Sequence, residues 1–438
     1  MDAQKIYGPK DKPPLAKWIP LSFQHVFAMF GATILVPILT GLSTSTALFT
    51  AGTGTLIYIL ITGAKVPAFL GSSFAFIPAL IGITEKYGVE YAMGGAIFAG
   101  LFYCLIATII KFSGKNWIDK ALPPVVIGSV IIVIGMSLSG SAINNAMFQN
   151  GSYSLVATSI AAVTLLIAVV ATIFLKGFFN TISILIGLIG GYLFTLIMGF
   201  ISEKYRFIDF TAVREAKWIG LPFLHTNEAG QYYWMAPKFN VVAIITFIIV
   251  SISTICEHLG DTLTTSTVVG QDFTKNPGLH RTLCGDGIAT AWAAIWGGPP
   301  NTTYGENIGV MAITKVYSVW VIGGAAVIAV ILSFCPKFGA LIQTIPNPVL
   351  GGICILLYGL IASSGLRTIV ESGVDYKDKR NLTISSVIMV LGIGGGLLEF
   401  KIGSNFTFSL GGVALATIVG IILNLIIPNS EKEKVSKD

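Results

Sequence analysis

The chain has 438 residues, of which 54% are hydrophobic and only 11% are charged, and its mean hydropathy is +0.80. Soluble domains carry about 25% charged residues, so this composition excludes a soluble globular protein and indicates one that crosses a membrane many times. The net charge of +6 is what cytoplasmic loops supply in such a protein, and it gives no reason to expect a nucleic-acid partner.

Apolar segments follow one another along the chain in two predicted groups of seven. The first group comprises residues 20–42, 45–63, 67–84, 91–112, 122–139, 155–175 and 181–201. After the polar stretch 202–238, the second comprises residues 239–264, 285–298, 299–316, 317–335, 347–364, 382–399 and 408–427. An odd number of crossings in each group would give the two halves opposite orientations. We therefore predict an all-α polytopic membrane protein with 14 transmembrane segments in a 7+7 inverted repeat.

Positive charge predicts the orientation of these segments. Lys and Arg are more frequent in the loops that would share the side of the N-terminus. Because positively charged loops stay in the cytoplasm, residues 1–19 and 428–438 are predicted to be cytoplasmic and the loop 202–238 extracellular. The expected location is the cell membrane.

The third segment of each group is interrupted in a similar way. Residues Lys65–Phe76 (KVPAFLGSSFAF) and Pro299–Lys315 (PPNTTYGENIGVMAITK) contain proline, then small and polar residues, then an apolar run. Proline stops a preceding helix, so each stretch predicts a helix that begins partway through the membrane. Interrupted helices at matching positions of two halves indicate a transport site. The alternative for the second stretch is a short loop between two ordinary helices, with Glu306 in headgroup water.

Acidic side chains mark the eighth segment. Glu257 and Asp261 are four residues apart and would share one helix face, with His258 on a neighbouring face. Together with Glu306 these carboxylates would repel one another when ionised, so at least one is expected to carry a proton, as a proton-coupled carrier requires. This repulsion favours the proton over sodium, which carboxylates also bind. The alternative is a helix that ends near Cys256 and leaves the acidic residues in water.

Five residues, Glu306, Asn307, Gly309, Thr314 and Lys315, form the pattern Glu-Asn-x-Gly-x4-Thr-Lys. This pattern resembles the signature of the nucleobase–ascorbate transporter family, also called nucleobase:cation symporter 2. The longer run NTTYGENIGVMAIT and the EHLG sequence of the eighth segment resemble the bacterial uracil-permease branch in particular. The resemblance implies a secondary active transporter, not an enzyme, that imports uracil with protons by alternating access.

The resemblance also implies roles for individual residues. Two glutamates would hold opposite sides of the base, and backbone N–H groups at two helix starts would donate to its carbonyl oxygens. The residues implied in binding the base are Ser73, Phe74, Glu257, Tyr304, Gly305 and Glu306. Those implied in proton coupling are Glu257, Asp261 and Glu306.

Two domains that move against each other are a further implication of the resemblance. A core domain would contain residues 20–112 and 239–335, and a gate domain would contain residues 122–201 and 347–427. Short strands would pair where the third and tenth segments break. Members of the family commonly form homodimers in the lipid bilayer.

Several alternatives remain open. Well-known uracil permeases have His four residues after the glutamate of the eighth segment, where this chain has Asp261, a form that resembles the purine (xanthine and urate) branch. An anion transporter of the related sulfate-transporter fold would need positive charge at the broken helices, and no Arg lies near Glu257 or Glu306 in the sequence. A membrane enzyme has little support, because the His residues are dispersed and the Cys residues follow no metal or disulfide spacing. We expect no cofactor and no metal.

Overall fold

Helices dominate the structure, a computed structural model that describes residues 7–226, 232–402 and 406–428. Within these residues, eight helices are long and apolar enough to cross a membrane, and a pair bent by 86° would make a ninth. The eight are α1 (Leu15–Thr40), α2 (Thr44–Ile61), α4 (Val89–Ser113), α6 with α7 (Pro124–Ser137 and Ser139–Met147), α8 (Leu155–Phe174), α10 (Ser183–Ile201), α12 (Val241–Val269) and α17 (Asn347–Glu371); the bent pair is α15 (Val319–Ser333) with α16 (Pro336–Gln343). The structure is that of a multi-pass membrane protein, whereas fourteen crossings in a 7+7 repeat stay a prediction.

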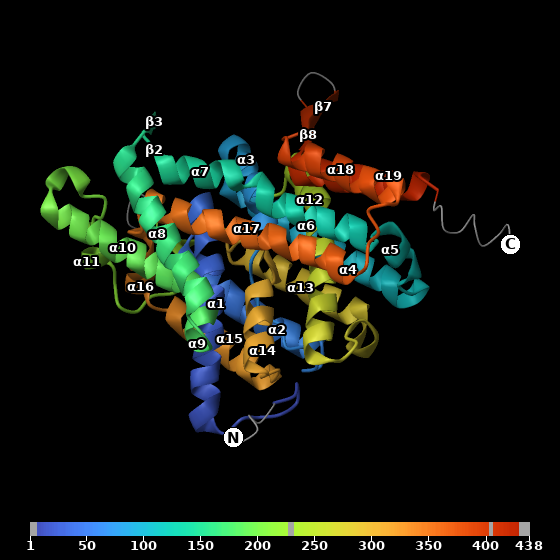
Figure 1. The fold of residues 1–438 in the computed structure, drawn as a ribbon, viewed down its shortest axis with the longest axis horizontal. Coiled ribbons are helices and arrows are strands. Elements are labelled where there is room, and N and C mark those ends of the chain that lie inside the picture. Colours follow the sequence, from blue (N-terminus) through green and yellow to red (C-terminus); the bar gives the residue numbers. More distant parts are fainter. Residues whose placement is uncertain (1–6, 227–231, 403–405, 429–438) are drawn as a thin grey trace.

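The long helices pack against partners that are distant in the sequence. In Figure 1, α17 lies along α6 in the middle of the molecule and also contacts α8, on which α10 packs. α4 packs against α12 and α13 (Leu279–Ile295), and α2 packs against α13 and α15. Helices of the second half of the chain therefore interleave with helices of the first.

Two short strands form where the interrupted segments were expected. β1 (Leu70–Ser72) pairs antiparallel with β6 (Asn301–Thr303), which confirms the predicted strand pair. β1 leads into the short 3-10 helix η1 (Phe74–Phe76) and then α3 (Ile77–Tyr87), and β6 leads into α14 (Gly305–Thr314). The two helix starts therefore lie beside each other.

Hydrogen bonds from neighbouring helices complete the strand pair. The Leu70 N–H donates to Thr55 Oγ1 at 2.9 Å, and the Asn301 carbonyl accepts from Thr290 Oγ1 at 2.9 Å. The Asn301 side chain donates through Nδ2 to the Thr50 carbonyl at 3.1 Å. Backbone groups without partners are costly in an apolar layer, so these bonds from α2 and α13 allow the chain to break there.

The thirteenth predicted segment, 382–399, ends differently from the prediction. α18 (Lys379–Ile393) stops before three successive glycines, and Gly395 adopts a left-handed φ of 69°. The chain then forms a hairpin in which β7 (Leu397–Ile402) pairs with β8 (Phe406–Gly411). A helix to residue 399 is therefore wrong at its C-terminal end, because glycine readily takes the backbone conformation that ends a helix.

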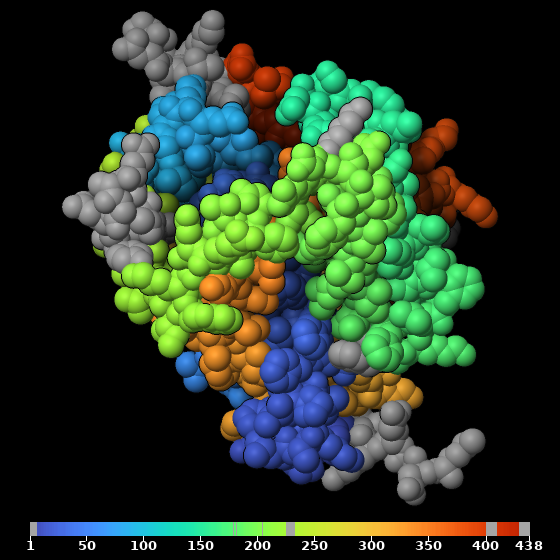
Figure 2. All heavy atoms as spheres, turned by 90° about the vertical axis from the view of Figure 1, so that its left-hand side faces the viewer, coloured from blue at the N-terminus to red at the C-terminus, as the bar shows by residue number. Residues whose placement is uncertain are grey.

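The polar stretch 202–238 covers part of one face. Figure 2 shows its light-green portion lying over the orange segment that contains α15 and α16. The Gly220 N–H donates to the Phe334 carbonyl at 3.0 Å, which fixes this contact. Part of the predicted loop, residues 227–231, lies outside the described residues.

Short elements connect the long helices. They are α5 (Asn116–Ala121), β2 (Phe148–Gln149), β3 (Ser152–Tyr153), α9 (Phe178–Thr181), η2 (Glu203–Tyr205), α11 (Thr211–Glu215), β4 (Leu224–Thr226), β5 (Tyr232–Trp234) and η3 (Thr274–Gly278), and α19 (Gly412–Ile426) is the last helix. The predicted cytoplasmic ends are described only from residue 7 and as far as residue 428.

Glycines bring α4 and α13 into backbone contact. A Cβ atom on Gly100 would lie 2.3 Å from the Gly287 carbonyl oxygen and 2.7 Å from the Ala291 nitrogen. A Cβ atom on Gly287 would lie 2.6 Å from the Gly100 carbonyl oxygen. Only residues without a side chain permit this approach, which small residues commonly provide between membrane helices.

We therefore expect Gly100→Ala to destabilise the protein, because its methyl group would overlap backbone atoms that cannot rotate away. Overpacking of this kind costs about 1–3 kcal/mol. The thermal unfolding midpoint of the detergent-purified protein should fall by several degrees. Gly82→Ala in α3 is the matched control, since a Cβ atom there meets nothing within 4 Å. Equal midpoints for the two variants would contradict the close α4–α13 contact.

Candidate functional site

A cavity of about 360 Å³ lies at the two helix starts. Its walls include parts of α12, η1, β6, α14 and α17. Seven residues that the sequence analysis singled out line it, namely Phe74, Glu257, Asp261, Tyr304, Gly305, Glu306 and Gly309. The fold thus brings residues of the third, eighth and tenth predicted segments to one place.

α12 presents two of the three carboxylates to this cavity. The helix continues to Val269, so the alternative in which it ends near Cys256 is wrong. Glu257 and Asp261 both line the cavity and are half-buried. Glu257 Oε2 is buried and has no hydrogen-bond partner among the described residues, whereas Asp261 Oδ2 accepts from Thr303 Oγ1 at 2.8 Å. Glu257 therefore has a buried carboxylate oxygen that no described residue satisfies.

α14 supplies the third carboxylate and a helix start. Tyr304 is the N-cap residue, Gly305 begins the helix, and Glu306 lies in the first turn. No side chain caps this end, so the first N–H groups of the helix carry the partial positive charge of a helix N-terminus. The alternative of a simple loop between two ordinary helices is wrong, because a buried strand and then a helix occupy this stretch.

Aromatic rings border the cavity at both helix starts. Phe74 is only 5% exposed, and its ring meets that of Tyr358 edge-on at a centroid distance of 5.7 Å. Tyr304 is also part of the lining, but its hydroxyl donates to the Ser72 carbonyl at 3.0 Å and its ring lies against Gly71 of β1. Ser73, which was predicted to lie beside a bound base, is fully buried and is not part of the cavity lining.

The remaining signature residues are structural in this conformation. Asn307 Nδ2 donates to His25 Nδ1 at 3.0 Å and to the His25 carbonyl at 3.1 Å, which joins α14 to α1. Thr314 Oγ1 donates to the Val310 carbonyl at 2.8 Å inside the last turn of α14. Lys315 follows with a left-handed φ of 55° and ends the helix.

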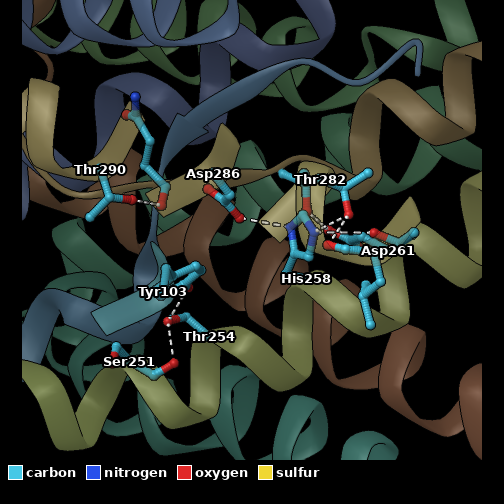
Figure 3. Close-up of polar contacts among 12 residues, drawn as sticks. Tyr103, Ser251, Thr254, His258, Asp261, Thr282, Asp286 and Thr290 are labelled. Carbon is cyan, nitrogen blue, oxygen red and sulfur yellow. Dashed lines mark hydrogen bonds and ion pairs between the residues drawn. The ribbon is translucent and has the colours of Figure 1, made fainter. Parts of the chain in front are cut away.

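A buried polar pair behind the cavity was missed by the sequence analysis. Figure 3 shows His258 between Asp286 and Thr282, with both of its ring nitrogens engaged. Its Nδ1 lies 2.8 Å from Asp286 Oδ2, and its Nε2 lies 3.1 Å from Thr282 Oγ1. The available signal was an acidic residue, Asp286, inside a short apolar segment. The pair joins α12 to α13 directly beside Glu257.

An arginine that is distant in the sequence also lies at the acidic site, so the expectation of a site without Arg is wrong. Arg367 of α17 lines the same cavity, and its Nε donates to Glu371 Oε1 at 2.8 Å. It is distant in sequence from Glu257 and Glu306, and the packing of α17 brings it there. Among the described lining residues, three carboxylates therefore face one cation that is itself paired with a carboxylate.

These features define a class of protein. Apolar helices cross a membrane repeatedly, two helices begin inside the protein, and a cavity lined by three carboxylates lies at those starts, as in secondary transporters. Residues 16–399 match the Permease family, and the chain belongs to this family. It is a membrane transporter and not an enzyme, and the resemblance to nucleobase transporters is confirmed.

Relatives match the chain over nearly its full length. It is 48% identical to the uracil permease of Bacillus subtilis (strain 168), with 99% of this chain and 98% of that protein covered. It is 43% identical to the uracil permease of Escherichia coli (strain K12), with 97% and 94% covered. A putative pyrimidine permease of the same organism is 38% identical, with 96% and 92% covered.

Solved structures share the fold at low sequence identity. One is the transmembrane domain of a cyanobacterium bicarbonate transporter, BicA, with a TM-score of 0.63, 14% identity, and 96% of this chain and 100% of that one covered. Another is the murine anion transporter Solute Carrier 26 family member A9, with a TM-score of 0.66, 12% identity, and 95% and 69% covered. These likenesses concern the fold alone.

Substitutions of Thr303 can test the Thr303–Asp261 hydrogen bond. Thr303→Val keeps the shape of the side chain but removes the donor, which leaves an oxygen of the half-buried Asp261 without this partner at a cost of about 1 kcal/mol. We expect a lower thermal unfolding midpoint for Thr303→Val, while Thr303→Ser should retain the native value because it keeps the hydroxyl. A native midpoint for Thr303→Val would contradict a stabilising role for this hydrogen bond.

Proposed function

We propose that this chain is a uracil permease that imports uracil together with protons. Relatives that are 48% and 43% identical to it over nearly all of their length bear the name uracil permease, which supports this substrate. The structural observation that carries the proposal is the presence of Glu257 and Glu306 on one small cavity, with an uncapped helix start beside them.

The cavity has the hydrogen-bonding groups that a uracil ring needs. Uracil alternates ring N–H donors and carbonyl acceptors around its edge. The carboxylates of Glu257 and Glu306 would accept from the N–H groups, and backbone N–H groups at Gly305 and Phe74 would donate to the carbonyl oxygens. The free Oε2 of Glu257 and the adjacent aromatic ring of Phe74 fit a small, flat, polar ligand.

Asp261 would act in proton coupling without contacting the base directly. One of its oxygens is already held by Thr303 in the cavity wall. This bond supports a role for Asp261 in the cavity wall, in place of the histidine of other uracil permeases, without a third carboxylate among the proposed ring contacts. A purine substrate is the alternative outcome if Asp261 proves to be a direct ligand.

Charge within the cavity supports coupling to protons. Glu257, Asp261 and Glu306 are half-buried on one cavity, and Arg367, which is paired with Glu371, is the single cation among the described lining residues. Like charges in a site of low dielectric cannot all remain ionised, so a proton would bind with the substrate and leave with it. The excess of carboxylates disfavours an anionic substrate, although the fold is shared with anion transporters.

Transport would proceed by alternating access. A core domain of residues 20–112 and 239–335 would rock against a gate domain of residues 122–201 and 347–427, with the cavity between them. α12 and α14 would belong to the core, and α17, which supplies the opposite wall, would belong to the gate. We further propose a cell-membrane location, cytoplasmic ends and a homodimer.

The test is uptake of labelled uracil by proteoliposomes with an inwardly directed proton gradient. We expect accumulation of unchanged uracil that a protonophore abolishes, that needs no sodium and that excess xanthine does not inhibit. If the proteoliposomes take up xanthine but not uracil, the proposed substrate is wrong and xanthine takes its place. If uptake requires sodium and continues in the presence of the protonophore, the proposal that protons are the coupling ion is wrong.

Isosteric changes of the three carboxylates should separate their roles. Glu257→Gln and Glu306→Gln each remove an ionisable acceptor aimed at the ring, so the dissociation constant for uracil should rise about tenfold or more. Asp261→Asn should leave more binding than Glu257→Gln, because its contact is with the wall, but it should lose accumulation driven by the proton gradient. If Glu306→Gln binds uracil with native affinity, Glu306 is not a uracil-binding residue.

A further inference from the structure

The segment that precedes α1 is not a free cytoplasmic end. Residues Tyr7–Lys12 lie against the turn that joins α14 to α15, and we propose that they form a strap that positions α14, and with it Glu306, for substrate binding. The term strap is used below for residues 7–12. The proposal rests on the proposed function, because uracil is the ligand whose binding would report the position of Glu306.

Backbone hydrogen bonds attach the strap to the turn. Tyr7 and Val316 form an isolated parallel bridge. The Tyr317 N–H donates to the Tyr7 carbonyl at 2.8 Å, and the Val319 N–H donates to the Pro9 carbonyl at 3.0 Å. Tyr7 and Val316 are both nearly fully buried. The strap therefore adds a short strand to the exit of α14.

The strap also acts as the cap of α15. Ser318 is the N-cap residue of that helix, yet its side chain makes no capping bond; its Oγ donates instead to the Asp11 carbonyl at 2.5 Å. The first N–H group of α15, at Val319, is satisfied by the strap. Uncapped helix N–H groups lack partners within the helix, so the strap replaces the side chain that would ordinarily supply one.

Side-chain contacts and an internal turn also hold the strap in place. Lys12 Nζ lies 5.2 Å from the centroid of the Trp320 ring and 5.8 Å from that of Trp18, within the range of a cation–π contact. Trp18 Nε1 donates to the Trp320 carbonyl at 2.6 Å. The strap is pre-shaped by its own turn, in which the Asp11 N–H donates to the Gly8 carbonyl at 3.1 Å and Asp11 Oδ2 accepts from the Gly8 N–H at 2.9 Å.

α14 depends on such external supports because it is short. It has 10 residues, fewer than the roughly 12–15 that an isolated helix needs for marginal stability. The strand pair holds its N-terminal end, the Asn307–His25 bonds hold one side, and the strap holds the chain just beyond Lys315. A helix rises about 1.5 Å per residue, so Lys315 and Glu306 lie about 13 Å apart at the two ends of one rigid element, and a shift of one end moves the other.

Two deletions test the strap in the otherwise complete chain. One removes residues 2–12, and the matched control removes residues 2–6, which precede the strap. We expect the longer deletion to raise the dissociation constant of the folded, detergent-purified protein for uracil at least about fivefold, and the control to leave it within twofold. Amide hydrogen exchange at Tyr317 and Val319 should accelerate only in the longer deletion. A purely stabilising segment would lower the unfolding midpoint without changing the affinity of the folded fraction.

A point series gives an answer even if the longer deletion does not fold. Ser318→Ala removes the donor to Asp11, and Ser318→Thr keeps it. We expect Ser318→Ala to weaken uracil binding about three- to tenfold, because it loosens the end of α14 and the free energy of one hydrogen bond sets the upper bound, and Ser318→Thr to bind as the native protein does. Native affinity in the folded longer deletion, or in Ser318→Ala, overturns the proposal.

Failure of the native protein itself to bind uracil would refute the proposed substrate instead. In that case amide hydrogen exchange alone tests whether the strap holds the turn between α14 and α15. Faster exchange at Tyr317 and Val319 in the longer deletion than in the control supports the strap, and equal exchange refutes it.

Discussion

The constraint on which this structure depends is that a membrane-embedded chain cannot leave its backbone polar groups without partners. The chain nevertheless stops two helices inside the bundle, at β1 and β6. The two strands satisfy each other, and hydroxyl groups of α2 and α13 together with the Asn301 side chain complete the set. Because the breaks are paired, the two helix starts that follow them face one cavity.

The carboxylates around this cavity are carried by two helices, and each helix is held in place by buried side-chain contacts with a neighbouring helix. α12 carries Glu257 and Asp261, and behind them the His258–Asp286 pair ties α12 to α13. α14 carries Glu306 and is tied to α1 through Asn307. Carboxylates that share one cavity titrate as a coupled group, so the charge on one changes the proton affinity of the others, which in the proposed mechanism links the proton to the substrate.

The cavity walls differ in how they are held. The glycine contact between α4 and α13, the strand pair and the strap all fix elements of the predicted core to one another. Across the cavity, α17 meets η1 through the edge-on contact of Phe74 with Tyr358. An aromatic contact of this kind contributes only about 0.5–1.5 kcal/mol beyond its buried area, so breaking it would cost little in the proposed rocking motion.

The sequence by itself determined the multi-pass class, the two interrupted segments, the helix start at Gly305 and the shared face of Glu257 and Asp261. Each of these follows from hydropathy, proline placement or helical spacing, which act over a few residues along the chain. Only the tertiary structure placed Arg367 on the cavity, paired His258 with Asp286, turned the Tyr304 hydroxyl toward Ser72 and laid residues 7–12 on the end of α14. Those contacts join residues far apart in the sequence, so they exist only once the helices have packed.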